Sequence, residues 1–155
     1  MVRLADLPEW DRKNKLAKID ELAGFDARPW VLPPPLARCR IAIVTTAGLH
    51  RKGDRPFRVG ATDYRIIPGN TRAADLLMSH QSVNFDRTGF QEDHNVAFPI
   101  DRLRGLAERG VIGSVAAYHY SFMGATQVRD LEAKATELAG VLKGDRVDAV
   151  VLTPV

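Results

Sequence analysis

The sequence predicts an α/β fold with a predominantly parallel sheet. Short apolar segments alternate with amphipathic helical segments, most regularly after Phe98, and this alternation is typical of parallel sheets covered by helices. Residues 147–155 are a run of β-branched and aliphatic residues with one early polar position, which is the pattern of a strand buried on both faces. We therefore expect a three-layer, Rossmann-like domain over residues 37–155, incomplete at its C-terminus, preceded by an extended N-terminal arm over residues 1–36.

The arm is expected to hold one helix and one extended segment. Asp6 is a candidate helix cap and Gly24 a candidate stop. The segment 28–35 contains four prolines, which favour an extended, polyproline-like conformation. Trp10 and Trp30 are candidate anchors that would hold the arm on the domain or on a partner subunit.

Within the domain, apolar runs bounded by Gly, Pro and polar residues mark the strands, predicted at 40–46, 64–68, 76–78, 111–117 and 147–155. A short helix over 71–78 is an alternative to the third strand. One helix is predicted to begin at Pro99 and end at Gly110. A second covers 127–142, where apolar residues recur at steps of three and four. Residues 81–95 are expected to form a loop.

Composition excludes several classes of protein. The 155 residues are 45% hydrophobic and 26% charged, with a net charge of +3, as in an ordinary globular domain. No apolar run approaches a membrane span, and the N-terminus lacks a signal-peptide core, so a cytoplasmic location without membrane association is expected. Basic residues are not interleaved with aromatic ones, which disfavours nucleic-acid binding. Cys39 is the single cysteine and is expected to be a buried structural thiol.

Polar residues and small residues follow three of the predicted strands. If these strands are parallel, their carboxyl ends meet at one edge of the sheet, where ligands of α/β proteins bind. We expect the following residues to line a pocket for a small ligand: Thr45, Thr46, Gly48, His50, His119, Ser121 and Thr153. An alternative is that the threonines only satisfy backbone groups at the strand ends.

A second group of polar residues lies in the predicted loop. His80, Asp86, Asp93 and His94 are residue types that bind metals or transfer protons. Their spacing matches no metal signature, and Asx turns and helix caps explain Asp and Asn in loops more often than chemistry does, so no metal is predicted. Ser79 and Ser121 lack a nucleophile elbow. The residues alone therefore predict a pocket without a nucleophile.

Several words of the sequence resemble the selenoprotein B family of glycine, sarcosine, betaine and D-proline reductases. The resemblance covers roughly residues 28–155, and its most specific words are Val44-Thr45-Thr46-Ala47-Gly48-Leu49-His50, Asp93-His94-Asn95-Val96-Ala97-Phe98-Pro99-Ile100-Asp101-Arg102-Leu103, Gly110-Val111-Ile112-Gly113-Ser114-Val115-Ala116, His119-Tyr120-Ser121-Phe122-Met123-Gly124 and Leu152-Thr153-Pro154-Val155. The sequence of the loop 81–91 departs from the usual pattern of the family. The positions of His80 and Asp86 in the family pattern are therefore open.

The resemblance implies a selenocysteine, or a cysteine, directly after Val155, followed by a proline and a nearby cysteine. Because selenocysteine is encoded by an ordinary stop codon, it implies that this chain is truncated there and is inactive as a reductase. The catalytic nucleophile would then lie outside the chain, and no cofactor is expected within it. The implied reaction is reductive cleavage of the C–N bond of a small amino acid or an N-methyl derivative. The site histidines would position or protonate the departing amine, and strand-end amides would hold the carboxylate.

Other interpretations stay open at this point. Members of the family work with partner subunits, some of which carry a pyruvoyl group, and the resemblance extends this possibility to the present chain. A non-catalytic α/β module that binds a small metabolite is one alternative. A metal-dependent hydrolase that uses the loop between His80 and His94 is another. If the segment after Val155 is missing, apolar surface of the sheet would be left uncovered, and this would also favour a homo-oligomer.

Overall fold

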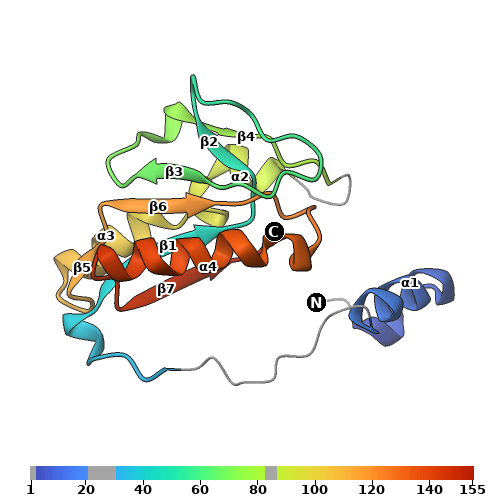
Figure 1. Cartoon of the computed structure of the whole chain (residues 1–155), viewed down its shortest axis with the longest axis horizontal. Helices are drawn as coiled ribbons and strands as arrows, with labels where there is room; N and C mark the ends of the chain where they lie inside the picture. Colours follow the sequence, from blue (N-terminus) through green and yellow to red (C-terminus); the bar gives the residue numbers. More distant parts are fainter. Residues whose placement is uncertain (1–2, 21–30, 83–86) are drawn as a thin grey trace. The chain divides into compact units, whose positions relative to one another are not determined.

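The computed structural model describes residues 3–20, 31–82 and 87–155 (Figure 1). The chain divides into two compact units, Met1–Val31 and Leu32–Val155. In the first unit a 3-10 turn, Leu4–Asp6, precedes helix α1 (Glu9–Asp20), which confirms the predicted helix. Gly24 and Trp30 lie outside the described residues, and Trp10 is largely exposed within the described part. The anchoring role of the arm stays a prediction.

The second unit is built on a mostly parallel, curled sheet around β1 (Arg40–Thr45). Strand β7 (Ala149–Thr153) pairs with β1 in parallel along its whole length. Strands β5 (Ser114–Val115) and β6 (Tyr118–Ser121) pair in parallel with the first and last residues of β1, on the side away from β7. Strand β3 (Arg65–Pro68) adds to β6 in antiparallel orientation. The predicted α/β class with a predominantly parallel sheet is confirmed.

The strand predicted over 111–117 is replaced by two shorter strands, β5 and β6, and a histidine side chain of β6 fills the gap in their pairing with β1. The Ile43 N–H of β1 donates to Nδ1 of His119 at 3.0 Å. In an uninterrupted parallel ladder a carbonyl of the neighbouring strand would accept this N–H. The imidazole therefore takes the place of a backbone group, and the ladder is broken between β5 and β6. The predicted strand bounds are wrong because residues 119–121 lie inside β6 and do not follow a strand.

A second, two-stranded sheet is antiparallel and joins β2 (Leu49–Arg51) to β4 (Leu76–Met78). The strand at 76–78 confirms that prediction, and a 3-10 turn, Ala73–Asp75, leads into it. Strand β2 was not predicted, since the sequence places Leu49 and His50 in the segment after β1. Both residues are buried, and pairing with β4 satisfies the backbone that their burial would otherwise leave without partners.

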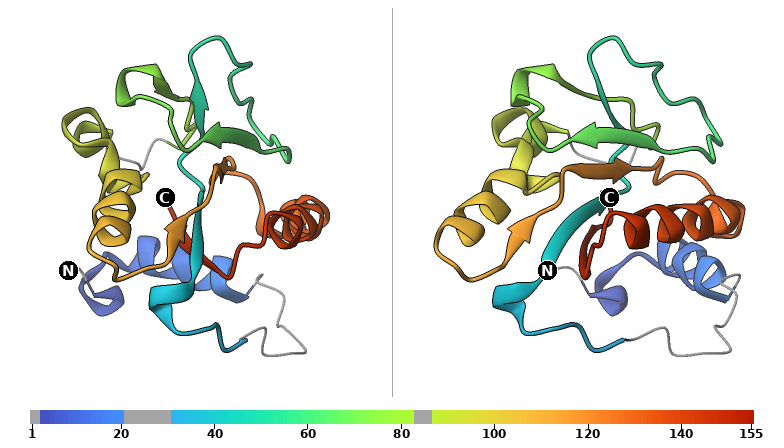
Figure 2. Two further views of the ribbon diagram at one scale, coloured as in Figure 1. Left: turned by 90° about the vertical axis from the view of Figure 1, so that its left-hand side faces the viewer. Right: turned by 60° about the vertical axis from the view of Figure 1, so that its left-hand side comes forward.

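The two long helices of the unit, α3 (Ile100–Glu108) and α4 (Val128–Gly144), cover opposite faces of the sheet (Figure 2). Ile100 and Leu103 of α3 belong to the same apolar cluster as Ile41 and Ile43 of β1. On the other face, a separate cluster joins residues of β6, its carboxyl end and α4: Tyr120, Phe122 and Leu138. One long helix thus covers each face, while the Rossmann-like arrangement as a whole stays a prediction.

Short helical segments complete the described chain. A 3-10 turn, Leu36–Arg38, precedes β1. Helix α2 (Thr88–Glu92) and a 3-10 turn, His94–Val96, occupy part of the region predicted as a loop, so that prediction is wrong for those residues. Asp93 explains the turn, because its carboxylate accepts the N–H of Asn95 as a cap. None of the described helices is long and apolar enough to cross a membrane.

Candidate active site at the carboxyl edge of the sheet

Three hydroxyl residues meet at the carboxyl ends of β6, β1 and β7. Thr45 pairs with Ser121 on one side and with Thr153 on the other, so the three residues form one row across the sheet (Figure 1). Parallel strands bring their ends together in this way whatever their separation in sequence. The structure therefore brings together three of the residues predicted to line a pocket.

The hydroxyl groups in this row are engaged by the backbone. Thr45 Oγ1 donates to the Thr153 carbonyl at 3.2 Å and accepts the Ala47 N–H at 3.2 Å. Ser121 Oγ accepts the Leu49 N–H at 2.7 Å. Thr153 Oγ1 donates to the Ala97 carbonyl at 3.0 Å. Thr45 and Ser121 are fully buried. These groups shape the edge of the sheet and satisfy its backbone, in line with the alternative considered for the threonines.

Thr46 and Gly124 fix the position of Val155. Thr46 Oγ1 accepts the Val155 N–H at 2.8 Å and donates to the Val155 carbonyl oxygen at 3.3 Å. Gly124 packs against the same oxygen so closely that a Cβ on it would lie 2.5 Å away. The same Cβ would lie 2.7 Å from the Thr46 carbonyl oxygen. The end of β7 is therefore held from two sides by parts of the chain that follow β1 and β6.

His80 contacts the same position from a third side. The ring is buried, with Nε2 3.0 Å from the place that a Cβ on Gly124 would occupy. Nδ1 accepts the Ser82 N–H at 3.2 Å, so in the neutral ring the proton is on Nε2. Burial lowers the pKa of His80, a hydrogen bond with the Val155 backbone opposes this, and the charge of Arg87 lowers the pKa further. A neutral His80 therefore offers a donor at the end of β7.

Gly48 allows the loop after β1 to pass between these groups. Its φ is +64°, a conformation that favours glycine, and a Cβ there would lie 3.0 Å from the His80 nitrogen. Its N–H donates to the Phe122 carbonyl and its carbonyl accepts the Ser79 N–H, both at 2.9 Å. Gly48 thus positions His80 through the backbone.

His50 forms a pair with Ser79 that the sequence did not indicate. Its Nε2 lies 2.7 Å from Ser79 Oγ, and its Nδ1 lies 3.0 Å from the Arg51 carbonyl oxygen. Since a carbonyl can only accept, Nδ1 carries the proton and Nε2 accepts from the serine. His50 is buried, whereas Ser79 is half-buried. This pair fixes the strand end that directly precedes His80.

His119 lies in the core and not among the residues around Val155. It is fully buried, and its ring packs in a T-shaped arrangement with Phe98, with the ring centroids 5.5 Å apart. Its Nδ1 accepts the Ile43 N–H. Burial, with a smaller effect from Arg104, lowers the pKa of His119 from 6.5 to about 4. The residue is therefore neutral near pH 7.

The acidic candidates are also placed outside this edge, or outside the described chain. Asp93 accepts hydrogen bonds from Asn95 and Arg102, and the Asn95 bonds are the main reason that the pKa of Asp93 is lowered. His94 Nε2 lies 3.1 Å from an Asp101 oxygen. Asp86 lies outside the described residues. Over the ranges that the structure describes, no three His, Cys, Asp or Glu side chains are grouped so that they could hold a metal ion.

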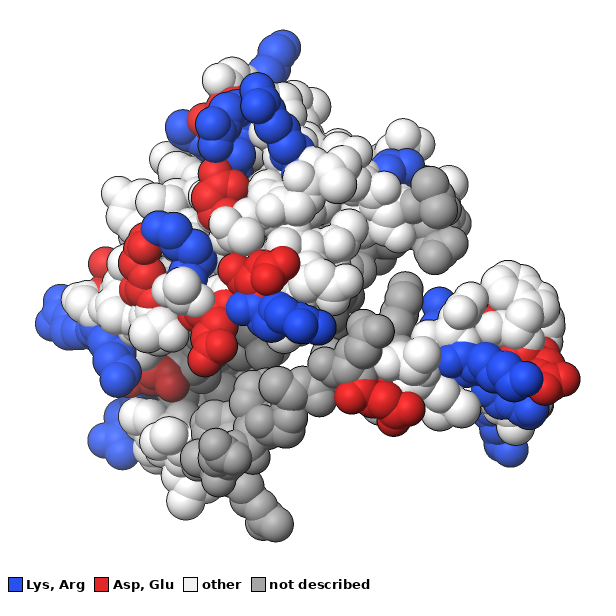
Figure 3. All heavy atoms as spheres, turned by 45° about the vertical axis from the view of Figure 1, so that its right-hand side comes forward, with Lys and Arg blue, Asp and Glu red and all other residues white. Residues whose placement is uncertain are grey.

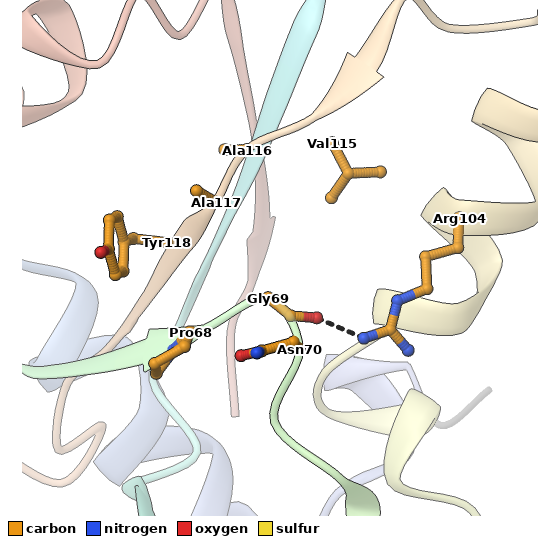
Figure 4. A pocket seen from close by; sticks show the side chains of 8 residues that line it. All are labelled: Pro68, Gly69, Asn70, Arg104, Val115, Ala116, Ala117 and Tyr118. Carbon is orange, nitrogen blue, oxygen red and sulfur yellow. Dashed lines mark hydrogen bonds between the residues drawn. The ribbon is translucent and has the colours of Figure 1, made fainter.

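Two surface hollows lie elsewhere on the unit. The larger, about 450 Å³, lies beside the break between β5 and β6, where Arg104 donates to the Gly69 carbonyl (Figure 4). The other, about 410 Å³, includes Arg51 and Arg72 in its lining. Neither includes a residue of the predicted pocket. On the face seen in Figure 3, basic and acidic side chains of this unit neighbour one another, as the small net charge leads one to expect.

Comparison with known proteins identifies the family. The protein-family model described as glycine/sarcosine/betaine reductase selenoprotein B matches residues 24–155. The chain belongs to this family. The resemblance found in the sequence is thereby confirmed, and no solved structure matches the chain significantly.

Individual relatives of the family are subunits of reductases. The chain is similar to the D-proline reductase subunit gamma of Acetoanaerobium sticklandii, with 37% identity over 79% of this chain and 54% of the relative. The glycine reductase complex component B subunit gamma of Symbiobacterium thermophilum is 35% identical over 85% of this chain and 32% of the relative. The sarcosine reductase complex component B subunit beta of Peptoclostridium acidaminophilum is 34% identical over 76% and 28%. The chain thus spans between about a quarter and about half of the length of these relatives.

Sequence reasoning missed the contacts that organise this edge. It named Thr46 and Gly48 but not Gly124, and it did not pair Thr46 with Val155 or His50 with Ser79. One signal in the sequence could have indicated the contact with Val155. Thr46 and Gly124 are both small residues, and each lies at or shortly after the carboxyl end of a predicted parallel strand. The partners themselves are 109 and 29 residues apart, and no local pattern links them.

Proposed function

We propose that this chain is part of a selenocysteine-dependent reductase that cleaves the C–N bond of a small amino acid or an N-methylated derivative. The nucleophile would directly follow Val155, so the 155 residues alone would be inactive. We further propose that the protein acts together with partner subunits, as the names of its relatives indicate for them.

The observation that carries this proposal is the fixed position of Val155 at the carboxyl edge of the sheet. Thr46 binds both backbone groups of Val155, Gly124 packs against its carbonyl, and the His80 ring lies at the same Gly124 position. A reacting group attached at such a point is held in one place, which is what orientation in catalysis requires. A selenolate there would supply a polarisable nucleophile that is ionised at neutral pH.

The roles of the residues follow from their protonation and contacts. The lowered pKa of His80 keeps the ring neutral, so it would orient the strand end by a hydrogen bond and would not act as a strong acid. Thr46 would set the direction in which the chain leaves β7. His119 would support the sheet from inside without touching the substrate, since both its burial and its bond to Ile43 separate it from the edge.

The first test is to read the genomic DNA after the Val155 codon. We expect an in-frame opal codon followed by codons for a proline and a nearby cysteine. The second test is activity of a chain extended through that segment with cysteine at the opal position, mixed with the partner subunits and a dithiol donor. Glycine, sarcosine, betaine and D-proline would be the substrates, and the same chain with serine at that position is the matched control.

Turnover by the cysteine form, absent from the serine form, would support the proposal and reject a module that only binds metabolites. A downstream sequence without an opal codon would contradict it. The metal-dependent hydrolase finds no ligand set among the residues with described positions, and we do not propose it.

A further inference from the structure

Arg87 is hydrogen-bonded to His80, whose ring lies beside the end of β7. Its Nη2 donates to the His80 carbonyl at 2.6 Å, a short charge-assisted bond. The His80 ring in turn lies against the Gly124 position that packs on the Val155 carbonyl oxygen. The guanidinium is therefore tied to the same residue that contacts the end of β7.

Within the described residues, one donor of the Arg87 guanidinium is engaged. The residue is exposed, and a guanidinium has five N–H donors, of which the His80 carbonyl uses one. Arg102 and Arg104, in helix α3, form ion pairs with Asp93 and Asp101. In the described part of the chain no acidic side chain forms an ion pair with Arg87.

The positive charge of Arg87 also acts on this edge of the sheet. It contributes to the lowered pKa of the buried His80 ring. The hydrogen bond from Nη2 places the source of this charge at the backbone of the same residue. A positive charge is thus bonded to the residue whose neutral imidazole lies beside the end of β7.

We propose that Arg87 binds the carboxylate of the substrate. This inference rests on the proposed function, because glycine, sarcosine and D-proline, which the names of the relatives contain, all carry a carboxylate on the α-carbon. Guanidinium and carboxylate match in two parallel hydrogen bonds. Since the α-carbon is bonded directly to the carboxylate, Arg87 would hold the reacting carbon at the edge where Val155 ends.

The test is carboxylate binding by the 155-residue chain, followed through the NMR signals of the His80 ring. We expect glycine, sarcosine and D-proline to shift these signals, and glycinamide, which lacks the carboxylate, to leave them unchanged. Arg87→Gln should weaken binding about 10-fold or more, and Arg87→Lys should weaken it less, because the charge is kept and the two-bond geometry is lost. Arg58→Gln removes another exposed arginine without a described acidic partner and should leave binding unchanged.

Two results would overturn the inference. One is the absence of a shift with any carboxylate at concentrations up to 100-fold above an expected dissociation constant of about 1 mM. The other is equal affinity of Arg87→Gln and the unchanged chain. Circular dichroism of each variant shows whether a loss of binding reflects a loss of fold. Binding here is measured without turnover, so failure of this inference is distinct from failure of the proposed reaction. In the extended enzyme, Arg87→Gln should raise KM more than it lowers kcat.

Discussion

At the scale of single residues, His119 shows how a side chain can take over a backbone role. Its Nδ1 accepts the Ile43 N–H inside the sheet, and this requires a neutral ring. Burial supports the same state by lowering the pKa of His119 to about 4. The residue was predicted for the pocket because it follows an apolar run, but its contacts are those of a structural histidine.

This pKa predicts a loss of stability in weak acid. Above pH 6.5 the ring is neutral in both the folded and the unfolded chain. Between pH 6.5 and about 4 the unfolded chain takes up a proton that the folded chain does not, so the free energy of unfolding falls, by about 3 kcal/mol in all. Urea unfolding of the protein and of His119→Asn between pH 7.5 and 5 checks this.

The asparagine variant should lack that part of the pH dependence, because its Oδ1 can accept the Ile43 N–H without titrating. His119→Leu leaves the N–H unpaired and should cost about 1–3 kcal/mol at pH 7.5. Equal pH dependence in the protein and His119→Asn would show that His119 is not the titrating group.

Gly124 supports a second prediction at this scale. An alanine there would bring a Cβ within 2.5 Å of the Val155 carbonyl oxygen and 2.7 Å of the Thr46 carbonyl oxygen, and both are backbone atoms. Gly124→Ala should therefore destabilise the fold by about 1–3 kcal/mol. Thermal unfolding measures the change.

Gly140→Ala is the matched control for Gly124→Ala, since Gly140 lies in α4 with nothing near its Cβ position. It should stabilise the protein by up to about 1 kcal/mol, because alanine favours a helix. A neutral Gly124→Ala would mean that Val155 is free to move away from residue 124.

At the scale of elements, the small sheet of β2 and β4 positions the site. Ser79 and His80 directly follow β4, and β2 contains His50. The bond between Ser79 and His50 joins the end of β4 to the middle of β2. This bond therefore stabilises the segment from which His80 reaches Val155.

Ser79→Ala should leave the buried Nε2 of His50 without its donor. We expect a loss of about 1–3 kcal/mol, with faster amide hydrogen exchange in β2 and β4 than in β1. Ser79→Thr keeps the hydroxyl and serves as the control. If exchange in the small sheet is unchanged in Ser79→Ala, the pair contributes nothing to its stability.

At the scale of the whole molecule, β7 is an edge strand in the part of the chain that the structure describes, since it pairs with β1 alone. Its first four residues are apolar, and Leu152 is 71% exposed. An exposed, apolar edge strand can pair with another chain. The oligomer expected from the sequence stays a prediction, and this edge is where we expect the contact.

Light scattering should show association of the 155-residue chain that rises with concentration. Leu152→Lys should reduce it, because a charged side chain on an edge strand opposes pairing. Val59→Lys, at a residue that is 83% exposed outside the sheet, should leave association unchanged. A monomer at all concentrations would contradict the prediction.

The sequence by itself determined the α/β class, the central strand, the two long helices and the family. These depend on the local periodicity of apolar residues and on short sequence motifs, both of which are visible in the linear chain. Only the tertiary structure decided that the His119 ring accepts a backbone N–H of β1, that His50 meets Ser79, and that Thr46 holds Val155. Such contacts depend on the register of strands that lie far apart in the chain. Local hydrophobic pattern specifies which face of a strand is buried, but it does not specify which side chain meets which backbone group across the sheet.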